Sequence, residues 1–141
     1  MVPPVFKIVE TSLYVNDLEL SESFYTGVLG LRVHSRKEDR DVFLVAGRNM
    51  LLLFNPRFLK KEKELEGESA IPQIYETSRT HIAFEIDPPD YDAWKAHLAA
   101  SKVDIEQEVR WDNGSRSMYF RDPDGNVIEL IEHGLWPVPP R

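Results

Sequence analysis

The side chains of this sequence that could do chemistry are imidazoles and carboxylates, because the chain contains no cysteine. No disulfide framework, thiolate metal site or cysteine nucleophile is therefore available, and a metal ion would have to bind His, Asp, Glu or water. The sequence also lacks a glycine-rich phosphate-binding loop and a nucleophile motif. Chemistry carried by His and carboxylate side chains is what remains.

Two of these side chains occupy matching places in two strand-like segments. Residues 9–15 alternate with a period of two, which is typical of a half-buried strand, and Glu10 faces away from the apolar set. Residues 81–86 alternate in the same way and begin with His81. An offset of 71 residues places Glu10 on His81, so we interpret the sequence as an internal repeat.

Helix and strand signals follow each of these segments. Asn16 or Asp17 can cap a helix that ends near Gly30, and residues 87–90 can cap a second helix. Alternation and turn residues predict strands over 31–35, 41–46 and 50–55 in the first half and over 115–121 and 126–132 in the second. The pattern therefore predicts an α+β protein with two βαβββ modules.

The composition changes at a few points that divide the chain. We predict one domain, with module one at 5–55, a charged linker or mobile flap at 56–79, module two at 80–134 and a proline-rich arm at 135–141. Residues 122–125, Asp-Pro-Asp-Gly, suit a tight turn between the last two strands.

Length and charge limit the class of protein. A chain of 141 residues with 42% hydrophobic content can bury a core without disulfides. Its 17 basic and 24 acidic side chains give a formal charge of −7, which opposes binding to nucleic acid. No signal peptide and no apolar run of membrane-spanning length is present, so we expect a soluble, cytoplasmic protein whose partner is a small molecule.

Two segments that bracket the chain resemble the vicinal oxygen chelate superfamily, which includes glyoxalases, extradiol dioxygenases, and bleomycin- and fosfomycin-resistance proteins. The first is residues 13–31, with Asp17-Leu18, Ser21, Ser23-Phe-Tyr25 and Leu29-Gly30, and the second is the hairpin of residues 119–131. The resemblance implies that the two βαβββ modules pair into a half-open barrel with a metal site in its cup. It also implies a homodimer.

The resemblance further implies a ligand set, because the family takes metal ligands from the first strand and the last strand of a module. These positions fall on Glu10, His81 and Glu129, and the optional fourth position falls near Leu51, which cannot coordinate. Glu10 departs from the commonest residue at its position, which is His. The implied cofactor is one divalent ion per site, such as Fe, Mn, Ni or Zn, with open positions for a chelating substrate.

The chemistry of this set depends on Glu10. Two carboxylates cancel the charge of a divalent ion, which disfavours the dioxygenase interpretation relative to a site with two His and one carboxylate. A carboxylate can also act as a base toward a carbon acid whose oxygen the metal polarises, so we expect Glu10 and Glu129 to be the catalytic residues. Ser117 and Tyr119 match substrate-contacting positions of fosfomycin-resistance members, and Arg116 is a candidate anchor for an anionic substrate.

Two functional hypotheses follow. The first is a metal-dependent enzyme, a lyase or isomerase of glyoxalase type or an oxygenase, that acts on a small substrate with two neighbouring oxygens. The second is a metal-free protein that sequesters a drug in the manner of bleomycin-resistance proteins, for which the −7 charge would attract a cationic ligand.

We expect surface roles for His34, His97 and His133, which have no partner at ligand spacing. The sequence does not identify the substrate, and it does not decide whether each site is built within one chain or shared by two.

Overall fold

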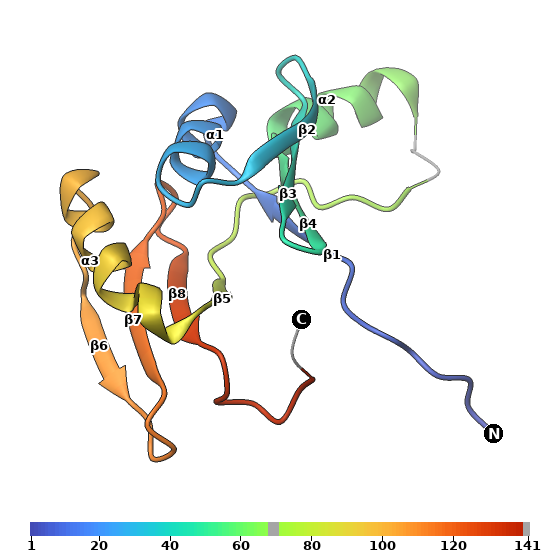
Figure 1. The fold of residues 1–141 in the computed structure, drawn as a ribbon. Coiled ribbons are helices and arrows are strands. Elements are labelled where there is room, and N and C mark those ends of the chain that lie inside the picture. The colour runs from blue at the N-terminus through green and yellow to red at the C-terminus, as the bar shows by residue number, and fades with distance from the viewer. Residues whose placement is uncertain (68–70, 140–141) are drawn as a thin grey trace. The chain divides into compact units, whose positions relative to one another are not determined.

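The computed structural model describes residues 1–67 and 71–139. The chain divides into two compact units, unit 1 at Met1–Ser78 and unit 2 at Arg79–Arg141. The fold of both units agrees with the predicted α+β class and its βαβββ modules (Figure 1).

In unit 1 the elements are β1 (Glu10–Tyr14), α1 (Leu18–Gly27), β2 (Arg32–Lys37), β3 (Asp41–Ala46), β4 (Asn49–Phe54) and α2 (Pro56–Glu66). In unit 2 they are β5 (His81–Ile86), the 3₁₀ turn η1 (Pro88–Asp90), α3 (Tyr91–Ala100), β6 (Gln107–Arg110), β7 (Arg116–Arg121) and β8 (Val127–Glu132). For the seven strands with predicted bounds, the observed boundaries agree to within two residues, whereas β6 had no predicted bounds.

The two sheets have the same topology. In unit 1 the strand order is β1-β4-β3-β2, and in unit 2 it is β5-β8-β7-β6. In each sheet the first strand pairs in parallel with the last strand of its module, whereas the other pairs are antiparallel. This shared order agrees with the repeat seen in the sequence, and it brings the first and last strands of each module side by side.

Helix α1 covers one face of the first sheet. The Asp17 side chain accepts a hydrogen bond from the Leu20 backbone N–H at 3.0 Å and so begins the helix, as an N-cap residue does. Tyr25 of α1 is fully buried, together with Leu44 and Leu53 of the sheet. These apolar side chains form the core of unit 1 and leave the opposite face for other contacts.

The opposite face of this sheet bears Glu10 and an apolar cluster that includes Leu52 and Phe54. Leu59 of α2 is buried in this cluster. Helix α2 thus occupies part of the segment 56–79 that the sequence suggests as a linker or flap. Asn55 caps it, with Oδ1 accepting from the next two backbone N–H groups. The prediction missed this helix because charged residues predominate in it and few apolar residues mark a period.

In unit 2 the side chains of each strand alternate between the two faces of the sheet. Helix α3 buries Tyr91 and Leu98 against the face that carries Met118 and Leu130. At the end of β7 the chain turns sharply: the Gly125 N–H donates to the Asp122 carbonyl at 3.0 Å, and Gly125 has a φ of +84°. The predicted tight turn is therefore present, and it sets the register that places the side chains of β7 opposite those of β8.

None of the helices in the described ranges has the length and apolar character needed to span a bilayer.

Candidate metal centre

The centre of the candidate site is the pair His81 and Glu129. Because β5 and β8 run parallel with Ala83 beside Glu129, the His81 side chain lies on the same face as Glu129, on the neighbouring strand. Its Nε2 lies 2.9 Å from Oε1 of Glu129. The Glu129 side chain is 6% exposed and the His81 side chain 52% exposed, so a nearly buried carboxylate meets an imidazole that solvent can reach.

Two residues of β7 complete the surroundings of the Glu129 carboxylate. The buried Ser117 hydroxyl donates to Oε2 of Glu129 at 2.6 Å. Tyr119 stands directly opposite Glu129 in the antiparallel register, and its ring centroid lies 5.9 Å from that of His81. Burial, the charge of Glu129 and a hydrogen bond to it raise the pKa of the Tyr119 phenol. Tyr119 is therefore a neutral hydrogen-bond donor at ordinary pH.

The donor atoms of this pair fit a divalent ion. With metal–ligand bonds of about 2.1 Å, two adjacent ligands of an octahedral ion lie roughly 3 Å apart, which the 2.9 Å separation of His81 Nε2 and Glu129 Oε1 matches. An imidazole nitrogen and a carboxylate oxygen are also the donor types that Fe, Mn, Ni and Zn accept. Within the part of the chain that the structure describes, no three His, Asp or Glu side chains gather at one point, so the pair supplies two donors.

Glu10, the third predicted ligand, belongs to unit 1. It is the first residue of β1 and is exposed. Its side chain lies on the opposite face of the strand from Leu13, which faces the core under α1. Leu51, at the predicted fourth position, is buried on β4, as its apolar side chain requires.

Arg116 lies apart from the pair. It is on the face of β7 that packs against α3, where Nε donates to Oε1 of Glu132 at 2.8 Å and the guanidinium lies 4.0 Å from the Tyr91 ring centroid. The Glu132 carboxylate also accepts from the Arg116 backbone N–H at 2.7 Å. The charge of Arg116 is thus already paired, so the structure gives no support to its expected role as an anchor for an anionic substrate.

Sequence reasoning missed a second imidazole–carboxylate contact on the same sheet. Nδ1 of His133 lies 2.5 Å from Oε1 of Glu85, whereas the sequence suggests no partner for His133. The spacing contains the signal, because Glu85 follows His81 by four residues and His133 follows Glu129 by four. A period of two places all four side chains on one face.

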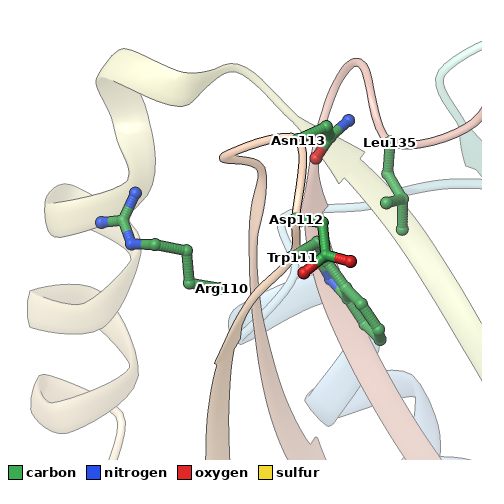
Figure 2. A pocket seen from close by; sticks show the side chains of 5 residues that line it. All are labelled: Arg110, Trp111, Asp112, Asn113 and Leu135. Carbon is green, nitrogen blue, oxygen red and sulfur yellow. The ribbon is translucent and has the colours of Figure 1, made fainter.

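Trp111 was also missed. Its indole Nε1–H donates to the Ser117 hydroxyl at 2.9 Å, so Trp111 reaches the surroundings of Glu129 through one intermediate side chain. Trp111 lines an open pocket of about 500 Å³, which Figure 2 shows with all of its lining residues: Arg110, Trp111, Asp112, Asn113 and Leu135. In that view Arg110 points away from the other four. The sequence offers only the alternation of Val109 and Trp111 as a hint.

Comparison with known proteins identifies the family. Residues 7–130 match the Glyoxalase/Bleomycin resistance protein/Dioxygenase superfamily, and the chain belongs to this family. The resemblance seen in the sequence, to the vicinal oxygen chelate proteins, is confirmed.

Individual relatives are similar to this chain over most of its length. The chain is 33% identical over 117 residues to the metallothiol transferase FosB of Bacillus licheniformis, covering 82% of this chain and 68% of that protein. It is 29% identical over 119 residues to the glutathione transferase FosA of Serratia marcescens, covering 84% and 75%. The crystal structure of lactoylglutathione lyase from Agrobacterium tumefaciens is similar with a TM-score of 0.85 and 36% identity, over 96% of this chain and all of that one. Such relatives use divalent metal ions, in agreement with the predicted cofactor.

Proposed function

We propose that this chain is a divalent-metal-dependent enzyme of glyoxalase type, a lyase or isomerase whose small substrate offers two neighbouring oxygens to the metal. The proposed ligands are His81, Glu129 and Glu10. The observation that carries the proposal is the nearly buried Glu129 carboxylate, which faces the His81 imidazole with one oxygen and accepts from Ser117 with the other. The 36% identity with a lactoylglutathione lyase over 96% of the chain favours a reaction of this type.

The ligand set defines what a metal would supply. When bound, a divalent ion would polarise the substrate oxygens and so acidify the neighbouring C–H group. Glu10 and Glu129 together would balance its double charge. The imidazole and carboxylate donors are compatible with Fe, Mn, Ni and Zn.

Each residue of the chain then has a distinct task. Ser117 donates to Glu129, which favours the ionised carboxylate and fixes its orientation. Tyr119, whose phenol stays protonated, is the proposed donor to a substrate oxygen. Glu10 is exposed on β1, and we assign to it the proton transfer to and from the substrate carbon. Arg116 is left out of the site, because Glu132 and Tyr91 already hold its guanidinium.

The names of the relatives indicate the class of substrate. Lactoylglutathione and glutathione denote a low-molecular-weight thiol or its conjugate, and metallothiol also names a thiol. We therefore propose a substrate that contains such a thiol. The second candidate function is transfer of a thiol to an electrophilic small molecule, and the identity with FosB favours it. Proteins of this fold are commonly dimeric, and we propose a homodimer.

Reconstitution tests these alternatives. Protein stripped with a chelator is reloaded with Mn, Fe, Ni or Zn, and its metal content is measured. The reloaded protein is then assayed for lactoylglutathione formation from methylglyoxal and glutathione, for thiol addition to fosfomycin, and for oxygen uptake with catechols. We expect one metal per site and the first activity.

Each other result has a definite meaning. Thiol addition in place of lactoylglutathione formation would support the second candidate, and oxygen uptake would support a dioxygenase. Failure to bind any of the four ions would refute the enzyme proposal and favour the metal-free ligand-binding hypothesis.

A further inference from the structure

A series of hydrogen bonds runs from Trp111 to the candidate metal centre. The Trp111 Nε1–H donates to Ser117 Oγ at 2.9 Å, and Ser117 Oγ donates to Glu129 Oε2 at 2.6 Å. On the other side of the carboxylate, Glu129 Oε1 lies 2.9 Å from His81 Nε2. The three contacts connect four side chains from β5, β7, β8 and the loop after β6.

The direction of these hydrogen bonds follows from the chemistry of the groups. An indole N–H can only donate, so the Ser117 oxygen accepts from Trp111. A serine hydroxyl has a single proton, and because the Ser117 oxygen accepts from Trp111, this proton points to Glu129 Oε2. Glu129 Oε2 is thereby occupied, and Oε1 is the oxygen left on the side of His81.

The loop that joins β6 to β7 holds the indole in place. The Trp111 backbone N–H donates to the Ser115 carbonyl at 2.8 Å, and the Gly114 N–H donates to the Trp111 carbonyl at 2.9 Å. Gly114 has a φ of +90°, which an L-residue rarely adopts. The Asn113 side chain ties the loop to the Gly134 carbonyl at 2.9 Å. The backbone of Trp111 is therefore fixed at both of its polar groups.

We propose that Trp111 is a positioning residue of the metal centre: through Ser117, it fixes the orientation in which Glu129 offers one oxygen beside His81. This inference rests on the proposed function, because it assumes that His81 and Glu129 bind a metal ion. Trp111 touches neither ligand itself. Its role differs from packing because it depends on one N–H group, although the same indole also lines the pocket of Figure 2.

The variant Trp111→Phe tests this role, because it keeps an aromatic ring and removes the N–H donor. Mn²⁺ affinity is measured by calorimetry on metal-free protein. We expect Ser117→Ala to lower the affinity about tenfold and Trp111→Phe to lower it several-fold, as loss of a partner behind a metal ligand does. In the Ser117→Ala background, Trp111→Phe should change the affinity by less than about twofold, because the connecting hydroxyl is already gone. The matched control is Trp94→Phe on α3, which should leave the affinity unchanged.

A spectroscopic readout of metal-free protein accompanies the affinities. In ¹⁵N-labelled protein the indole N–H resonance of Trp111, assigned by its loss in Trp111→Phe, should shift in Ser117→Ala. It should also shift in Glu129→Gln, two hydrogen bonds away. It should shift again when the metal-free protein is saturated with Zn²⁺, which takes the place of Mn²⁺ in this experiment because it is diamagnetic.

The outcomes separate this inference from the proposed function. Unchanged Mn²⁺ affinity in Trp111→Phe, or losses that multiply in the double variant, would overturn the positioning role while the metal centre stands. Absence of metal binding in the unaltered protein would refute the proposed function and this role with it, even if the indole resonance still responds to Ser117→Ala.

Discussion

Nε2 of His81 lies 2.9 Å from Oε1 of Glu129, although 48 residues separate the two along the chain. The parallel pairing of β5 with β8 brings them together, because it places Glu129 beside Ala83, two residues along β5 from His81 and on the same face. The sheet thus presents an imidazole and a nearly buried carboxylate on one face, and this pair is part of the metal site that we propose.

The first prediction concerns this pair. His81→Ala and Glu129→Ala should each lower the affinity for a divalent metal by on the order of 100-fold or more, because each removes a directly bound donor. Metal content after dialysis, measured by mass spectrometry, checks this. His97→Ala on α3 is the control and should retain the metal. Full metal content in both pair variants would show that the ion is bound elsewhere.

The second prediction concerns Glu10. If Glu10 is both ligand and base, Glu10→Gln should lower kcat more strongly than metal affinity, because an amide oxygen can still coordinate but cannot take up a proton. The expected loss in kcat is on the order of 10²-fold. Full activity in Glu10→Ala would remove Glu10 from the mechanism.

The third prediction asks which chain supplies Glu10. Glu10→Ala chains are unfolded, mixed with His81→Ala chains and refolded together. If the sites of a homodimer combine Glu10 of one chain with His81 of the other, about a quarter of the sites in a random mixture regain both residues and activity returns. If each site is built within one chain, the mixture stays as inactive as its components.

The fourth prediction concerns acid stability. Hydrogen bonds from Arg116 lower the pKa of Glu132 below its ordinary 4.5. A lowered pKa contributes stability that is present above the unfolded-state value and is lost as the pH falls through the folded-state value. The free energy of unfolding should therefore fall below about pH 4.5. Urea titrations at several pH values check this.

Glu132→Gln is the variant for this experiment. It should be less stable than the unaltered protein at neutral pH and should lose less on acidification, since the titrating group is gone. Glu64→Gln on the exposed side of α2 is the control. An acid profile of Glu132→Gln that parallels the unaltered protein would contradict the assignment.

The fifth prediction concerns alkaline stability. Burial and a hydrogen bond to Glu108 raise the pKa of Tyr91 well above its ordinary 10.0. The contribution of Tyr91 is complete below the unfolded-state pKa and is lost as the pH rises toward the folded-state pKa. Tyr91→Phe should make the loss of stability above pH 10 less steep, as thermal unfolding at increasing pH would show. An equally steep loss in the variant would assign it to other groups.

Much of the fold was predictable because it rests on local patterns. The alternation of residues 9–15 and 81–86 marks the two first strands, Asp17 caps α1 as its position suggests, and the Asp-Pro-Asp-Gly turn forms where those residues allow it. Helix α2 escaped prediction because charged residues predominate in it and its buried residues are Pro56 and Leu59.

The sequence by itself determined the family, the repeated βαβββ order and the sheet face on which each polar residue stands, because these depend on residue types and on a period of two. Only the tertiary structure decided which polar residues meet. The pairing of β5 with β8 joins His81 to Glu129, the register of β7 brings Ser117 to Glu129, and a hairpin loop turns Trp111 onto Ser117. The same packing joins Arg116 to Glu132 on the other face of the sheet. Such contacts depend on strand register between distant segments, which local pattern does not encode.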